Sequence, residues 1–177
     1  MKKIIIILCL TCFSIGFSQN KNTTTYPQYE WKGNALLLLG GALDISFEKY
    51  ISDDSGYGIS AFIAYDKDLD RKFSLTPYYR IYFGQKKAAG LFIEGFGMIN
   101  NYRTTAYTFE SMNFIALRQA TVTDLALGFG LGGKWITKKG ILFEINTGVG
   151  RNLLYKEDNV NRMEFVGRGG IGIGYQF

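Results

Sequence analysis

The chain has 177 residues, of which 22 are glycine, two are proline and 16% are aromatic, and its formal net charge is +5. It holds no histidine, and both of its cysteines lie within the first twelve residues. The rest of the chain therefore cannot form disulfides, Cys/His zinc sites or catalytic centres that need a histidine base or a cysteine nucleophile.

The first 18 residues have the pattern of a cleaved export signal, in which Lys2 and Lys3 precede an apolar run. The run is shorter than the ~20 residues that a membrane-spanning helix needs. We expect residues 1–18 to be removed and residues 19–30 to form a flexible lead; a lipoprotein acylated at Cys12 is the alternative. Without the two lysines, 18 basic residues remain against 15 acidic ones, so the charge does not indicate nucleic acid as a partner.

Eight stretches after residue 30 alternate apolar and polar residues with a period of two, which is typical of strands with one apolar face. They are residues 31–39, 42–51, 57–66, 73–83, 90–102, 121–136, 141–153 and 163–177. Most connections alternate between short and long, although the first is the tight turn Gly40-Gly41, and Pro77 predicts a bulge or local irregularity. The pattern predicts an all-β, eight-stranded antiparallel up-and-down barrel.

Odd-numbered positions carry the apolar residues of these stretches, and even-numbered positions carry the charges and many glycines. A soluble lipocalin-like barrel would turn the apolar face inward, and a transmembrane barrel would turn it outward. Glycine on the charged face favours the second, because a lumen of eight strands has little room for side chains. Aromatic residues at both ends of the apolar face also favour it, because they match the two girdles of a membrane barrel. These are Trp31, Tyr57, Phe83, Trp135, Phe143, Tyr175 and Phe177 at one end, and Tyr65, Phe73 and Phe165 at the other. We therefore predict a transmembrane β-barrel over residues 31–177 with a lumen filled by side chains.

The end of the chain resembles the closing strand of Gram-negative outer-membrane barrels, because apolar residues alternate with glycine and the last residue is Phe177. In those barrels this strand is an assembly signal, which Gly172, Tyr175 and Phe177 would form here. The region 34–177, including the segment 77–83 and the lysine-rich turn after it, resembles the small OmpA/OmpX-like eight-stranded barrels, of a type without an assigned function. The resemblance implies a monomer in the outer membrane, surrounded by lipid and inserted by the barrel-assembly machinery.

Six charged residues of the even-numbered face are candidates for a network inside the lumen. They are Glu48, Arg80, Glu94, Lys134, Glu144 and Arg168. Arg80 and Glu94 flank one turn almost symmetrically, and Lys134 and Glu144 flank another, so antiparallel pairing should make each pair neighbours. Such a network would either plug the barrel, because buried charges must be paired, or line a path for ions. We expect no cofactor, metal or catalytic residue.

Five arginines near the expected extracellular ends of the strands are candidates for a collar that holds the phosphates of lipopolysaccharide. They are Arg71, Arg103, Arg118, Arg151 and Arg162; ordinary solvated loops are the alternative. The connection 103–120 is unusually apolar, which indicates either a partner site or a hairpin that extends the fifth and sixth strands.

These observations predict a non-enzymatic outer-membrane barrel that stabilises the envelope or contacts partners through its outer loops. The alternatives are a narrow channel for ions or small solutes and a secreted, ligand-binding barrel of the lipocalin type. Enzymatic activity is not expected, because the barrel enzymes of this membrane depend on histidine.

Overall fold

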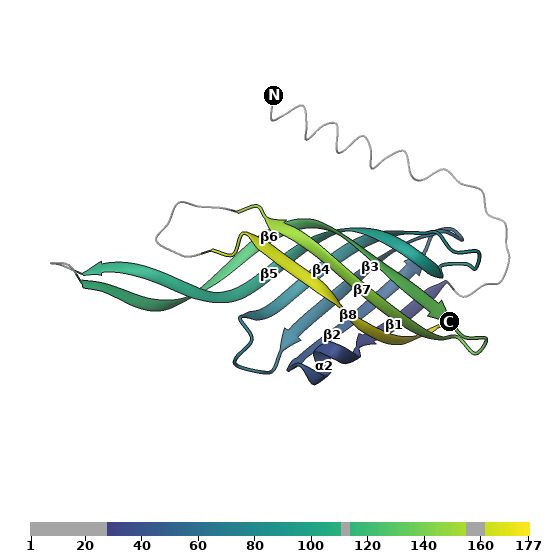
Figure 1. Ribbon diagram of the computed structural model, residues 1–177, viewed down its shortest axis with the longest axis horizontal. Coiled ribbons are helices and arrows are strands. Elements are labelled where there is room, and N and C mark those ends of the chain that lie inside the picture. Colours follow the sequence, from purple (N-terminus) through teal and green to yellow (C-terminus); the bar gives the residue numbers. More distant parts are fainter. Residues whose placement is uncertain (1–27, 111–113, 155–161) are drawn as a thin grey trace, which may run out of the picture.

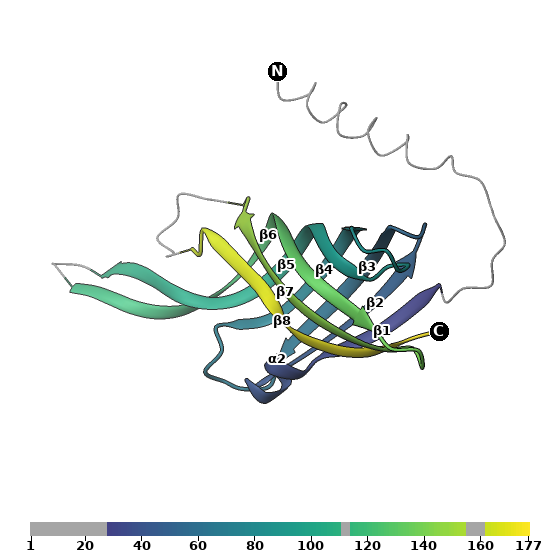
Figure 2. The ribbon, with the colours of Figure 1, turned by 45° about the vertical axis from the view of Figure 1, so that its right-hand side comes forward.

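Eight antiparallel strands close into a barrel, because β8 pairs with β1 as well as with β7 (Figures 1 and 2). The computed structural model describes residues 28–110, 114–154 and 162–177. Each strand pairs with its neighbours in the sequence, so the predicted fold class is confirmed. The elements are β1 (Tyr29–Asn34), α2 (Ala35–Leu39), β2 (Ala42–Tyr50), β3 (Ser55–Ala64), β4 (Arg71–Tyr82), β5 (Gly90–Glu110), β6 (Phe114–Ile136), β7 (Ile141–Asn152) and β8 (Phe165–Gln176).

The apolar residues of the strands face outward and the charged residues face the lumen. On β2 and β3, the odd-numbered Leu43 and Ile63 are exposed, whereas the even-numbered Ser46 and Ser60 are buried. The predicted girdle aromatics are exposed as well, and the ladders place Trp31 beside Tyr175. This arrangement is the reverse of the one that a soluble lipocalin-like barrel requires.

The first strand is shorter than predicted and begins earlier. β1 already contains Tyr29 and Glu30, which the sequence assigned to the flexible lead, and it ends at Asn34. The residues that follow, Ala35–Leu39, form the short helix α2 instead of strand. A run of four leucines has no alternation, so as a strand it would turn Leu36 and Leu38 into a polar lumen. Within the described ranges, no helix is long and apolar enough to cross a membrane.

The local irregularity predicted at Pro77 is an interruption of the β4–β5 ladder, in which Thr76 and Pro77 have no register partners, and not a bulge. The β4–β5 register is the same on both sides of Pro77, and it shifts between Arg71 and Phe73. Pro77 still aligns with Ile59 of β3. The shift changes which face the residues before Phe73 occupy, because an extra residue in one strand reverses the alternation there.

The predicted connection 103–120 is mostly strand. The β5–β6 ladder continues for eight pairs beyond Tyr102, from Arg103↔Thr121 to Glu110↔Phe114. These pairs form a two-stranded ribbon, 103–110 with 114–121, which projects from one end of the barrel (Figure 1). The backbone of this segment therefore agrees with the interpretation that it is a hairpin extending the fifth and sixth strands.

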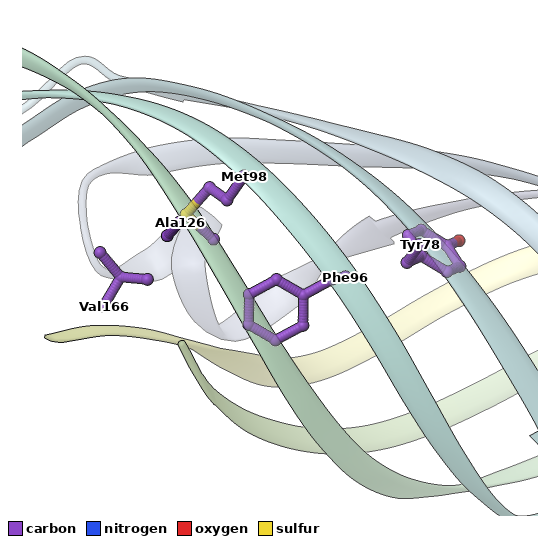
Figure 3. Close-up of a cluster of buried hydrophobic side chains, with 5 residues drawn as sticks. All are labelled: Tyr78, Phe96, Met98, Ala126 and Val166. Atoms are coloured by element: carbon purple, nitrogen blue, oxygen red, sulfur yellow. The ribbon is translucent and has the colours of Figure 1, made fainter. Parts of the chain in front are cut away.

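The lumen is filled in layers. Along β5, the inward residues Phe92, Glu94 and Phe96 follow one another, so a charged layer separates two apolar ones. The apolar layers are Tyr50, Tyr82, Ala88 and Phe92 towards the chain termini, and Tyr78, Phe96, Met98, Ala126 and Val166 on the other side (Figure 3).

Glycines of β6 make room for these rings. A Cβ on Gly132 would lie 2.5 Å from Cζ of Phe92, and a Cβ on Gly128 would collide with the ring of Phe96. This is the use of lumen glycines that the sequence predicts for a narrow barrel.

Candidate functional site: the charged lumen

Eight charged side chains lie together in the middle layer of the lumen. Four are cations (Lys32, Arg80, Lys134 and Arg168) and four are carboxylates (Glu30, Glu48, Glu94 and Glu144). They come from every strand except β3, whose inward positions beside this layer are Gly56 and Gly58. The charges balance, and seven of the eight residues are less than 9% exposed.

Arg80 is the centre of the network. Its Nε donates to Oε2 of Glu94 at 2.8 Å, and its Nη1 donates to Oε2 of Glu144 at 2.7 Å and to Oε2 of Glu48 at 3.2 Å. The guanidinium carbon lies 4.5 Å from the ring centroid of Tyr78 and 4.2 Å from that of Phe92. A planar, delocalised cation with several donors suits this position, which a lysine could not fill in the same way.

The two lysines bind the remaining carboxylates. Nζ of Lys134 lies 2.9 Å from Glu30 and 3.6 Å from Glu48, and it donates to the hydroxyl of Tyr82 at 2.5 Å. Nζ of Lys32 lies 2.6 Å from Glu144 and 3.0 Å from Glu30.

The expected contact between Lys134 and Glu144 is not the one that forms. Their Cα atoms are register partners across the β6–β7 ladder, but their charged groups turn to other strands. The ammonium group of Lys134 contacts the carboxylates of Glu30 and Glu48 and the hydroxyl of Tyr82. Glu144 already accepts hydrogen bonds from both Arg80 and Lys32. In a poorly solvated lumen, the arrangement with more partners for each charge is favoured.

Tyrosine hydroxyls complete the shell of the carboxylates. Tyr50 donates to Glu30, Tyr82 donates to Glu48, and Tyr78 donates to Glu48 at 3.2 Å. Every carboxylate of the network has a cation within 3.2 Å. The cations and hydroxyls therefore hold these carboxylates in place. Within the described ranges, no group of three residues that could hold a metal ion is present.

Arg168 occupies the margin of the network. Its Nη1 lies 3.2 Å from Oε1 of Glu94, yet neither atom has a hydrogen bond of good geometry. A polar hollow of about 20 Å³ beside it is lined by Lys32, Asn34 and Asp44 among others. This space suits about one water molecule.

The sequence did not identify Glu30, Lys32 or the three tyrosines as members. Lys32 has an even number and lies within the predicted first strand, so its position in the alternation was a usable signal. Glu30 does not stand out as a lumen residue in the sequence, because the polar residues before it favour a flexible lead. Strand pairing places Glu30 in β1, because Glu30 aligns with Glu48 on β2 and with Gln176 on β8.

The five arginines of the predicted collar do not form one group. Arg71 turns inward because of the register shift in β4, and its Nη2 donates to the carbonyl of Gly167 at 2.7 Å. Arg162 lies 3.8 Å from Oδ2 of the buried Asp124. Arg151 is exposed and pairs with Glu164 at 2.8 Å.

Arg103 and Arg118 lie on the ribbon, on opposite faces. Their register partners are Thr121 and Ala106, and the odd and even positions of a strand point to opposite sides. The collar is therefore divided between the barrel mouth, the outer wall and the ribbon.

The residues of the predicted assembly signal lie where the barrel closes. The amide of Phe177 donates to the carbonyl of Tyr29 at 2.9 Å, and the two rings stack with centroids 6.1 Å apart. Tyr175 is exposed on the outer wall, and Gly172 pairs with both Asn34 and Glu144.

The barrel is similar to a solved structure, the N-terminal β-barrel domain of Pseudomonas aeruginosa OprF, with a TM-score of 0.50. The sequences are 16% identical, and the match covers 85% of this chain and 96% of that chain. No family model and no curated protein matches the chain. At this level of identity, the likeness shows that the two chains share the eight-stranded barrel fold.

Proposed function

We propose that the chain is a non-enzymatic outer-membrane barrel with a plugged lumen, which stabilises the envelope and contacts partners through its outer ribbon. The outward apolar wall carries this proposal. Each of the eight strands carries large hydrophobic side chains that are at least 39% exposed, while seven of the eight charged residues of the lumen network are buried. Hydrocarbon is the solvent that suits such a wall, because apolar area of this extent is unfavourable in water.

The location is tested by fractionation and by heat modifiability. We expect the protein in the outer-membrane fraction, as a compact band that shifts when the sample is boiled before electrophoresis. A soluble periplasmic protein would contradict the proposal.

The plug is supported by the balanced, mostly buried charge network and by the apolar layers on both sides of it. The alternative, a narrow channel, would use the same polar lumen and the hollow beside Arg168. Single-channel recording in planar bilayers separates the two: we expect no steps above leak for the wild type. Reproducible steps would establish the channel instead.

Partner contact is proposed for the ribbon. Beyond Tyr102, the ladder to β4 ends after one further bond, from the Arg103 amide to the carbonyl of Asp70, whereas β5 and β6 continue. A projecting ribbon offers backbone edges and two faces to a partner.

A shortened variant tests this role. In it, residues 106–118 are replaced by Asn-Gly, so that Thr105 and Gln119, which are register partners, flank a two-residue turn. We expect a barrel of unchanged stability that fails to restore the envelope properties of a deletion strain. Full complementation by the shortened barrel would argue against partner contact through the ribbon.

Lipid, the barrel-assembly machinery and a monomeric state remain part of the proposal. Contact with lipopolysaccharide phosphate is proposed only for Arg103 and Arg118, because the other three arginines already have acceptors.

A further inference from the structure

The connection between β1 and β2 is the most apolar part of the barrel end that carries the ribbon. α2 has no buried residue, and Leu36, Leu38 and Leu39 are 53%, 51% and 89% exposed. Residues 33–43 include no charged residue. The connection between β3 and β4 at the same end is different, because it contains Asp66, Asp68 and Asp70.

α2 lies over a seam in the barrel wall. β1 stops at Asn34, opposite Gly172, while β8 continues to Phe165 without a β1 partner. Side chains bind two carbonyls of this part of β8: Asn34 donates to Gly169 at 3.2 Å, and Arg71 donates to Gly167 at 2.7 Å. α2 contacts both β2 and β8, so it covers the place where a longer β1 would have been (Figure 2).

The helix is continuous with the apolar wall. Leu43 on β2 and Ile63 on β3 are register partners below it, and they are 42% and 52% exposed. The hydroxyl of Tyr65, one of the predicted girdle aromatics, donates to the carbonyl of Leu38. This bond ties the leucines to the level of the girdle instead of the level of the charged loops.

We propose that α2 is a lipid-inserted wedge: Leu36, Leu38 and Leu39 lie among the acyl chains of the leaflet at the ribbon end and shield the seam. The inference rests on the proposed membrane location. The physical reason is that an uncharged cluster of exposed leucines that joins the apolar wall is stable in hydrocarbon and unfavourable in water. The membrane boundary therefore lies beyond this connection, whereas the acidic β3–β4 connection lies in water.

Spin labels on single cysteines test the wedge. The background is the full-length chain with Cys9→Ser and Cys12→Ser, purified from membranes and placed in lipid nanodiscs with one barrel each. Leu39→Cys and Leu36→Cys carry the label, and both positions are exposed enough to leave the fold intact. We expect the label to collide more often with oxygen, which concentrates in hydrocarbon, than with a water-soluble nickel chelate.

Two control positions calibrate the result. Leu127→Cys lies on the outer wall of β6, where the side chain is 58% exposed, and Asp68→Cys lies in the exposed acidic connection. If Leu39→Cys behaves like Asp68→Cys while Leu127→Cys favours oxygen, the wedge is wrong and the membrane location stands. Low accessibility to both reagents at Leu39 would mean that protein covers the helix, which also overturns the wedge. Access of the nickel chelate at Leu127 would overturn the membrane location itself, and the wedge with it.

Discussion

Replacing Arg80 by methionine should be among the most damaging single changes in the lumen. The variant keeps a long side chain between the rings of Tyr78 and Phe92, so little packing is lost. It removes the donors to Glu48, Glu94 and Glu144, all of which are buried. The balanced network would then carry one uncompensated negative charge in a poorly solvated place.

The cost should be about 3–5 kcal/mol, the range for removing one partner of a buried ion pair. Glu94 accounts for much of it, because Arg80 supplies the hydrogen bond to its Oε2, whereas Glu144 keeps Lys32 and Asn146 at 2.6 Å each. With an m-value of about 2 kcal/mol/M, the urea midpoint of the folded barrel should fall by roughly 1.5–2.5 M.

The assay is reversible urea unfolding in lipid vesicles, followed by the fluorescence of Trp31 and Trp135. Arg151→Met is the matched control, because it removes an arginine from an exposed pair with Glu164, which should cost about 0–1 kcal/mol. The double variant Arg80→Met/Glu94→Gln restores the balance of charge and should be more stable than Arg80→Met alone. The reasoning is refuted if Arg80→Met costs no more than Arg151→Met, or if the double variant is less stable than the single one.

Three further changes test other parts of the barrel. Lys32→Met should destabilise by an amount comparable to Arg80→Met, since its ammonium serves Glu30, Glu48 and Glu144; a midpoint equal to that of the wild type would count against its place in the network. Gly128→Ala should lower stability by about 1–3 kcal/mol in the same urea assay, because its Cβ would meet the Phe96 ring and the Val149 carbonyl. Gly95→Ala is its control, because nothing lies within 4 Å of a Cβ there, and equal losses for the two would refute the crowding argument. Deletion of Phe177 should reduce the amount of heat-modifiable barrel in membranes, because it removes the amide that bonds to Tyr29, whereas Phe177→Ala keeps that bond and tests the ring alone. Normal levels in the deletion variant would contradict a role in assembly.

The alternation of residues determined the architecture without any structure. Because side chains of a strand point to opposite sides with a period of two, the odd and even positions already separated the wall from the lumen. Arg80 and Glu94 flank the short connection 83–89 between β4 and β5 almost symmetrically, so their contact could be predicted from the sequence. The need for glycine on the crowded inner face of β6 followed from the small diameter of eight strands.

Only the tertiary structure decided how the lumen charges pair and where the wall departs from regularity. Lys134 and Glu30 are 104 residues apart, and Arg80 and Glu144 are 64 apart, so their contacts depend on closure of the whole barrel. The inward turn of Arg71 depends on a register shift that no pattern of residues marks. The early end of β1 also depends on the lumen, because Asp44 and Arg168 line the polar hollow beside Asn34, next to which Leu36 and Leu38 would point inward. Local periodicity specifies which face of the sheet a residue occupies. The partners that its side chain meets in the lumen are set by strands that are remote in the sequence.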